Sequence, residues 1–210
     1  MGGGKAKEVN KMRTKNGILL IGIALLVSCA FVGTASATDI YVPDNYEKIQ
    51  WAVDNATEGA TIIVRDGIYT ENVDVNIAHL TIRSQNGSAS VTVEASDPND
   101  YVFNVTADYV DISGFTVTGA NGYEKAGIYL QESTSPTISN STVENNTIGI
   151  SISGSSSLLK IRNCVISNNK GNGISSGGSS LEISFTDIVY NDGNGLYLSL
   201  IHISEPTRPY

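Results

Sequence analysis

Side chains suited to nucleophilic or metal chemistry are scarce in this sequence. Between residues 38 and 197 it holds one histidine, His79, one cysteine, Cys164, and no methionine. Copper sites are built from imidazole, thiolate and thioether ligands, and a nucleophilic triad needs a histidine beside its serine or cysteine. Because His79 and Cys164 are far apart in the sequence, we expect neither kind of site. His79 should lie at the edge of a strand, and Cys164 should be structural.

Carboxylates are more numerous, but their spacing does not pair them for catalysis. Hydrolysis of a glycosidic bond needs two carboxyl groups that flank it. Asp108 and Asp111 straddle an expected strand, and at three residues apart they should point to opposite faces. Arg162 follows Ile161 and is expected to face solvent as an ordinary surface residue. The sequence therefore marks no catalytic residue.

One loop offers ligands for an ion. Asp97, Asn99 and Asp100 supply the oxygen atoms that calcium prefers. The run Asp-Pro-Asn-Asp is also typical of an ordinary turn. Both interpretations stay open, and calcium is the only cofactor that the sequence suggests.

Several asparagines begin the triplet N-x-[ST], which is the acceptor sequence for N-linked glycans in exported proteins. A chain rich in Asn, Ser and Thr also makes such triplets by chance, so their use depends on the organism. The five glycosylation candidates are Asn55, Asn86, Asn104, Asn140 and Asn145.

The first 37 residues have the order of a secretory signal peptide. Five basic residues precede an apolar run from Gly17 to Val32, and a small-residue A-x-A site ends at Ala37. We expect cleavage after Ala37. Two alternatives remain, an uncleaved anchor, for which the apolar run is short, and lipidation of Cys29, because residues 26–29 resemble a lipobox. The protein is expected to be extracellular or at the cell surface, with membrane contact only through this leader or a C-terminal anchor.

Removal of the leader leaves an acidic chain. The sequence has 21 acids and 13 bases, of which the leader holds one acid and five bases, so 20 acids and 8 bases remain and the net charge is −12. Such a surface without a basic stripe repels phosphate backbones, so we exclude nucleic acid as a partner. The one remaining cysteine cannot form an internal disulfide, and packing must hold the fold.

A repeat of 22–24 residues organises the second half of the chain. Glycines followed by Ile or Leu recur at positions 127, 149, 173 and 195, and isoleucines recur at 138, 161 and 183. Each of these isoleucines precedes Val143, Ile166 or Ile188 by five positions, and Ile112 and Val117 look like the same pair one coil earlier, before an insertion around 119–125. This spacing predicts short strands that stack coil upon coil in parallel. The glycines are expected to turn the chain with a positive φ.

Asn146, Asn169 and Asn191 keep step with this repeat, each three residues after its partner in the second apolar set. In stacked coils they would form an asparagine ladder in which each side-chain amide bonds to the next. The alternative is the ordinary preference of asparagine for turns.

The segment before the repeat should close the N-terminal end. We predict strands at 39–42 and 61–64, a helix at 46–56 with Ile49, Ala52 and Val53 on one side, and a strand at 69–75. An amphipathic helix here would cover strand edges that otherwise invite aggregation. The predicted fold class is all-β, a parallel solenoid with a short N-terminal capping helix.

The run Ile40–Val53, the run Ala60–Val73 and the later Gly-Ile and Asn-Asn repeats resemble right-handed parallel β-helix proteins of the pectin-lyase-like group. The repeats look like the NosD-type and carbohydrate-associated kinds, and the style is similar to archaeal surface proteins. The resemblance covers about residues 39–197 and implies a right-handed parallel β-helix. The group includes lyases, hydrolases, esterases and inert binding surfaces, so it does not fix a function. Its hydrolase signatures N-T-D, D-D, G-H-G and R-I-K are absent.

Four segments follow from these observations. Residues 1–37 are predicted as signal peptide, 38–79 as N-terminal cap and first strands, and 80–197 as β-helix rungs that are incomplete at the C-terminus. Residues 198–210 resemble a translated sequencing adapter, so we expect them, His202 included, to be non-native and the natural protein to continue past residue 197.

The expected function is a structural or adhesive cell-surface module that binds polysaccharide or surface-layer proteins. Long solenoid faces suit such binding. The alternatives are a fragment of a polysaccharide lyase or hydrolase whose catalytic rungs are missing, and a metal-delivery factor of NosD type.

Overall fold

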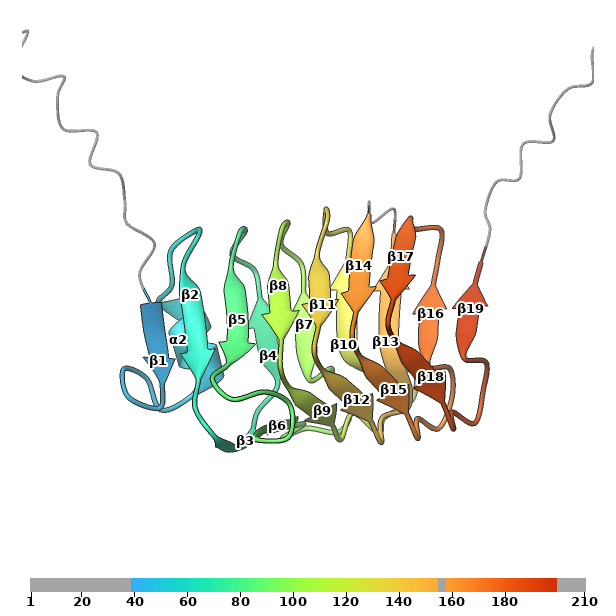
Figure 1. The fold of residues 1–210 in the computed structure, drawn as a ribbon, viewed down its shortest axis with the longest axis horizontal. Coiled ribbons are helices and arrows are strands. Elements are labelled where there is room, and N and C mark those ends of the chain that lie inside the picture. The colour runs from blue at the N-terminus through green and yellow to red at the C-terminus, as the bar shows by residue number, and fades with distance from the viewer. Residues whose placement is uncertain (1–38, 155–157, 200–210) are drawn as a thin grey trace, which may run out of the picture. The chain divides into compact units, whose positions relative to one another are not determined.

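The computed structural model describes residues 39–154 and 158–199, and these form a stack of parallel coils (Figure 1). The predicted signal peptide, with Ala37 and Cys29, lies outside the described residues, as does the predicted tail beyond Ser199. Over the described ranges, no helix has the length and hydrophobicity needed to span a bilayer.

Three parallel sheets run along the stack, and the chain visits them in turn. Sheet A contains β1 (Asp39–Val42), β2 (Thr61–Val64), β5 (Thr81–Ser84), β8 (Asp111–Ser113), β11 (Thr137–Ser139), β14 (Leu159–Arg162) and β17 (Leu181–Ser184). Sheet B contains β3 (Gly67–Thr70), β6 (Val91–Glu94), β9 (Thr116–Thr118), β12 (Thr142–Glu144), β15 (Val165–Ser167) and β18 (Asp187–Val189). Sheet C contains β4 (Val73–Val75), β7 (Phe103–Val105), β10 (Ala126–Gln131), β13 (Ile148–Ser153), β16 (Ile174–Ser176) and β19 (Leu196–Leu198). The last strand includes Leu198, the first residue of the predicted tail.

The strand register confirms the predicted repeat. Each sheet aligns the apolar residues that recur in the sequence, so that they form continuous columns inside the stack. The columns are Ile112, Ile138, Ile161 and Ile183 in sheet A, and Val117, Val143, Ile166 and Ile188 in sheet B. All are buried except Ile183 and Ile188 of the last coil, which are half-buried. Each fully buried side chain contributes about 1.5–3 kcal/mol of hydrophobic stabilisation.

Helix α2 (Ile49–Asp54) lies at the N-terminal end of the stack, against β1, β2 and β4 (Figure 1). It is shorter than the predicted helix over 46–56, and it buries Ile49, Ala52 and Val53 as expected. The carboxylate of Glu71, which is itself buried, accepts the backbone N–H groups of Ile49 and Gln50, each over 3.0 Å. Two of the N–H groups that a helix start leaves unpaired are thereby satisfied, and the helix is fixed to the first coil.

The predicted single strand over 69–75 is wrong, because the chain turns a corner at Glu71 and Asn72. β3 belongs to sheet B and β4 to sheet C. The N–H groups of Glu71 and Val73 donate to the carbonyls of Glu94 and Val102 in the following coil. The corner is hidden in the sequence because its two strands continue one alternating apolar pattern.

The repeated glycines do not turn the chain through positive φ, contrary to expectation. They lie where sheet B gives way to sheet C, and at three of them, Gly127, Gly149 and Gly173, a side chain would collide with the asparagine column. A Cβ on Gly149 would lie 2.9 Å from Nδ2 of Asn169 and 2.7 Å from Cγ2 of Ile166, and one on Gly127 would lie 2.7 Å from Nδ2 of Asn146. The left-handed positions are filled mostly by other residues, among them Asn140, Asn145, Asn163 and Asn168.

Candidate functional site

Asn146, Asn169 and Asn191 are stacked in one column at the corner between sheets B and C. Nδ2 of Asn146 donates to Oδ1 of Asn169 over 3.3 Å, and Nδ2 of Asn169 donates to Oδ1 of Asn191 over 2.8 Å. The same two oxygens accept the backbone N–H groups of Asn146 and Asn169 over 3.0 and 3.1 Å. Oδ1 of Asn146 accepts the N–H of Ala120 over 3.0 Å, so the column ends on a coil that has alanine at this position. The column satisfies buried polar groups and fixes the coils in register.

Two other asparagine contacts were not predicted from the sequence. Asn163 donates from Nδ2 to Oδ1 of Asn140 over 2.7 Å at the corner between sheets A and B. Asn72 follows Tyr69 of sheet B by three residues, the same spacing that separates Asn146 from Val143. Nδ2 of Asn72 donates to the carbonyl of Tyr101 over 2.8 Å. The three-residue spacing from Tyr69 could have predicted the contact of Asn72. It was not used, because residues 69–75 were expected to form one strand without a corner at Asn72.

The predicted calcium loop has the contacts of a turn. Oδ1 of Asp97 accepts the N–H of Asn99 over 2.8 Å, and Oδ1 of Asp100 accepts the N–H of Tyr101 over 2.8 Å. The Asp97 carbonyl accepts the N–H of Asp100 over 3.1 Å. These acceptors are engaged by the loop's own backbone, and in residues 39–154 and 158–199 no cluster of three or more His, Cys, Asp or Glu side chains could hold a metal ion.

His79 and Cys164 lie in separate places. His79 is in the turn before β5, stacks on Tyr109 with ring centroids 4.6 Å apart, and lies 3.6 Å from Glu58. Cys164 is buried in the core, and its Sγ contacts the carbonyls of Arg162 and Ile138. Desolvation by burial raises the pKa of the Cys164 thiol above its ordinary value. The arrangement makes Cys164 a packing residue rather than a nucleophile.

Of the charged residues considered for catalysis, Arg162 and Asp108 contact other groups and Asp111 is exposed. Arg162 lies on the outer face of β14 and pairs with Glu182 of the next coil over 2.7 Å. Asp108 accepts the N–H of Thr134 over 2.6 Å, and Asp111 begins β8 with its side chain exposed. They do not form a pair that could flank a scissile bond.

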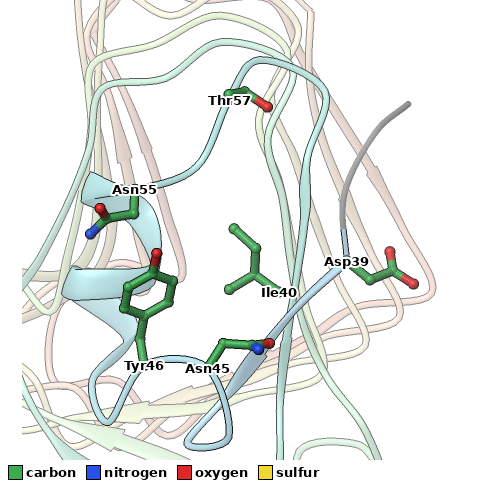
Figure 2. A pocket seen from close by; sticks show the side chains of 6 residues that line it. All are labelled: Asp39, Ile40, Asn45, Tyr46, Asn55 and Thr57. Carbon is green, nitrogen blue, oxygen red and sulfur yellow. The ribbon is translucent and has the colours of Figure 1, made fainter. Parts of the chain in front are cut away.

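A pocket of about 390 Å³ opens at the N-terminal end between β1 and α2. Figure 2 shows Tyr46 and Asn55 on one side of the hollow and Ile40 and Asp39 on the other. Its lining has one carboxylate, Asp39, and is otherwise amide, hydroxyl and apolar. The lining therefore offers no pair of carboxylates of the kind that flanks a glycosidic bond.

A larger groove of about 570 Å³ lies on the outer face of sheet C, and we call it the tyrosine groove. Tyr101, Tyr123 and Tyr129 form its wall, and Ser151 and Ser175 lie on its floor. The rings of Tyr101 and Tyr129 stack with centroids 4.2 Å apart and planes 12° apart. Lys125 Nζ lies 4.2 Å from the centroid of Tyr101, and Tyr123 is 87% exposed.

The five glycosylation candidates differ in how free their amides are. Asn55, Asn86 and Asn104 donate from Nδ2 to the Trp51 carbonyl, the Asp66 carboxylate and the Asp74 carboxylate. Oδ1 of Asn140 accepts the amide of Asn163. Asn145 is exposed in a left-handed turn, and among the described residues its side chain has no hydrogen-bond partner. Of the five candidates, Asn145 therefore has the side chain least engaged by the described fold.

Comparison with solved structures finds the same fold in a lyase and in an esterase. An alginate lyase from Paenibacillus sp. str. FPU-7 superposes with a TM-score of 0.59 and 20% identity, over 77% of this chain and 64% of the lyase. Pectin methylesterase PemA from Erwinia chrysanthemi gives a TM-score of 0.53 with 9% identity, over 70% of this chain and 54% of the esterase. At these identities the likeness shows the shared fold alone.

Comparison of sequences adds one curated relative and one family. A protein named cell surface glycoprotein, from Methanothermus fervidus, is 34% identical over 130 residues, which are 61% of this chain. The matched region spans only 21% of that relative's length. The family model described as right handed beta helix region matches residues 54–200, which include nearly all the stacked coils described above. The chain thus belongs to the right-handed β-helix family, as its sequence resemblance implied.

Proposed function

We propose that this chain is a module of a cell-surface protein, displayed outside the cell in a structural or adhesive role. The observation that carries the proposal is the 34% identity to the cell surface glycoprotein of Methanothermus fervidus. The net charge of −12 after removal of the leader supports it, because strong acidity keeps an exposed protein soluble. The stacked coils also support it, since a solenoid offers long faces for binding.

Surface display is tested by treating intact producing cells with protease and identifying the released peptides by mass spectrometry. Peptides from residues 39–199 should be released before lysis, while those of a cytoplasmic marker protein should not. Recovery of these peptides only after lysis would overturn the proposal.

We propose in addition that Asn145 carries an N-linked glycan. Asn145 is exposed, Thr147 completes its triplet, and attachment there breaks no hydrogen bond of the described fold. In the glycosylating host, Asn145→Asp should remove the glycan mass from the peptide that contains it. Asn168→Asp is the matched control, because Asn168 occupies the same left-handed turn position one coil later and begins no acceptor triplet. A glycan found on Asn104 but not on Asn145 would contradict the assignment.

An enzymatic role stays a second hypothesis for a longer protein that contains this module. It is favoured by the lyase and esterase among the structures that share the fold. Aligned carboxylates with an arginine or histidine on further coils would support it, and sequencing the gene beyond residue 198 is the direct test.

A further inference from the structure

The tyrosine groove exists because two neighbouring coils have long connections between sheets B and C. The segments 95–102 and 119–125 link β6 to β7 and β9 to β10, whereas only residues 145–147 link β12 to β13. The two long loops pack on each other, and the N–H of Gly122 donates to the carbonyl of Pro98 over 2.7 Å. A Cβ on Gly122 would lie 2.8 Å from Cα of Asn99, so the contact leaves no room for a side chain. The wall of the groove is thus a built structure that rises beside the flatter later coils.

The wall presents aromatic rings that are already ordered. Tyr129 points outward from β10 and stacks on Tyr101, and Lys125 sits over the Tyr101 ring. Stacking and the cation–π contact hold these side chains in place, which lowers the entropy lost when a ligand binds. Tyr123 stands beside them with its ring exposed to solvent.

The floor of the groove is made of small hydroxyl side chains. Tyr129, Ser151, Ser175 and Tyr197 are direct register partners along sheet C. At about 4.8 Å per strand, two serines therefore lie between tyrosines that are roughly 14 Å apart. Asn172 and Thr147 add an amide and a hydroxyl at the edge, and Ile148 adds an apolar contact.

The tyrosine wall and the serine floor together indicate which class of ligand the groove could bind. Tyrosine rings bind ligands that have both apolar and polar surface, and Ser, Thr and Asn side chains supply adaptable hydrogen bonds. The volume of about 570 Å³ falls in the range of about 300–1,000 Å³ that small ligands occupy. A protein partner would instead need roughly 800 Å² of surface with an apolar centre.

The charged groups beside the groove indicate whether its ligand is anionic or neutral. Burial raises the pKa of the Tyr101 hydroxyl above its usual value, and the neighbouring Tyr129, Asp100 and Glu124 raise it more. Lys125 is the one cation at the wall, and its ammonium group is placed over an aromatic ring. Asp100 and Glu124 would therefore repel an anionic sugar, whereas a neutral sugar would not be repelled.

We propose that the tyrosine groove binds a segment of neutral polysaccharide, with sugar rings stacked on Tyr129 and Tyr123 and sugar hydroxyls bonded to the serine floor. The inference gives the proposed surface module a partner class and rests on its display outside the cell. The purified chain suffices to test it, so a failure of binding and a failure of surface display can be told apart.

The test is calorimetric titration of the full chain with cellohexaose, mannohexaose and the hexamer of N-acetylglucosamine, with hexagalacturonate as the acidic comparison. At least one neutral hexasaccharide should bind and hexagalacturonate should not. Tyr129→Ala should weaken binding about tenfold, which is what the loss of one aromatic contact gives. Tyr129→Phe should bind within about twofold of the unaltered chain, because the stacking face is kept.

Two further variants guard against indirect effects. Tyr109→Ala removes an aromatic ring from a stacked pair outside the groove, and it should leave affinity unchanged. Ser151→Trp fills the floor from the solvent side and should abolish binding while the melting temperature is kept. Absence of binding by all three neutral hexasaccharides, equal binding of hexagalacturonate, or full affinity in Tyr129→Ala and Ser151→Trp would overturn the proposal. Capture of a purified protein through the same tyrosines without saccharide binding would replace the glycan with a protein partner.

Discussion

Replacement of Asn169 by alanine tests whether the asparagine column holds the coils together. Asn169 is 1% exposed and is the central member of the column. Its Oδ1 accepts the backbone N–H of Asn146, and its Nδ2 donates to the carbonyl of Val143 over 3.2 Å. Alanine removes both partners and leaves two buried backbone groups unpaired. At about 1–3 kcal/mol for each such group, the free energy of unfolding should fall by about 2–6 kcal/mol, a large part of the roughly 5–15 kcal/mol of a typical domain.

The loss should also be local, because each coil of a solenoid contacts only its neighbours. Hydrogen exchange followed by mass spectrometry should show lost protection in β12, β13, β15 and β16, with β2 and β5 still protected. Urea unfolding measures the overall change in free energy. Asn194→Ala is the control, since Asn194 is exposed with a side chain that makes no hydrogen bond within the described residues, and its effect should stay within about 0.5 kcal/mol.

Two results would refute this reasoning. One is an unfolding free energy for Asn169→Ala within about 0.5 kcal/mol of the unaltered chain, which is the range of neutral surface changes. The other is a loss of protection spread evenly over all coils, because the column then would not act between neighbours.

Three other predictions concern packing and the buried thiol. Gly149→Ala should destabilise the fold by about 2 kcal/mol in urea unfolding through overpacking, whereas Gly177→Ala, whose Cβ would meet its nearest neighbour at 3.7 Å, should be tolerated; equal effects would contradict the close-approach explanation. Ser176→Val should raise the melting temperature and increase the free energy of unfolding by about 1 kcal/mol. The reason is that the buried Ser176 hydroxyl has no hydrogen-bond partner within the described residues and aligns with Ile152. Ser175→Val on the outer face should give no such increase. In a Cys29→Ser background, Cys164 should resist Ellman's reagent at pH 8 and react fully in denaturant, because burial raises its pKa and disfavours the thiolate; rapid reaction of the native protein would show that the thiol is accessible.

The parts of the fold that repeat in every coil could be predicted from the sequence, and the parts that occur only once could not. Ile138, Ile161 and Ile183 are visible because every coil places the same apolar side chain at the same depth. The tyrosine groove had no such signal, because Tyr101, Tyr123 and Tyr129 come from two loops and an outer face that are not repeated. The positions of the repeated glycines could be recognised in the sequence. The reason why glycine is needed there could not, because it depends on groups that fold against the glycine from distant positions in the chain. Gly149, for instance, lies against the carbonyl of Gly173 and the side chains of Ile166 and Asn169, and Asn169 is 20 positions further along the chain.

The stacking of coils also determines how this module responds to force. A load applied along the axis acts on the hydrogen bonds between neighbouring coils, and the end coil is the first to detach because it has a neighbour on one side only. Each detached coil frees the 22–24 residues of one repeat, so that about 4.8 Å of stack becomes roughly 70–85 Å of extended chain. Under tension the module would lengthen in discrete steps of one coil and dissipate energy at each step, while the remaining coils stay folded.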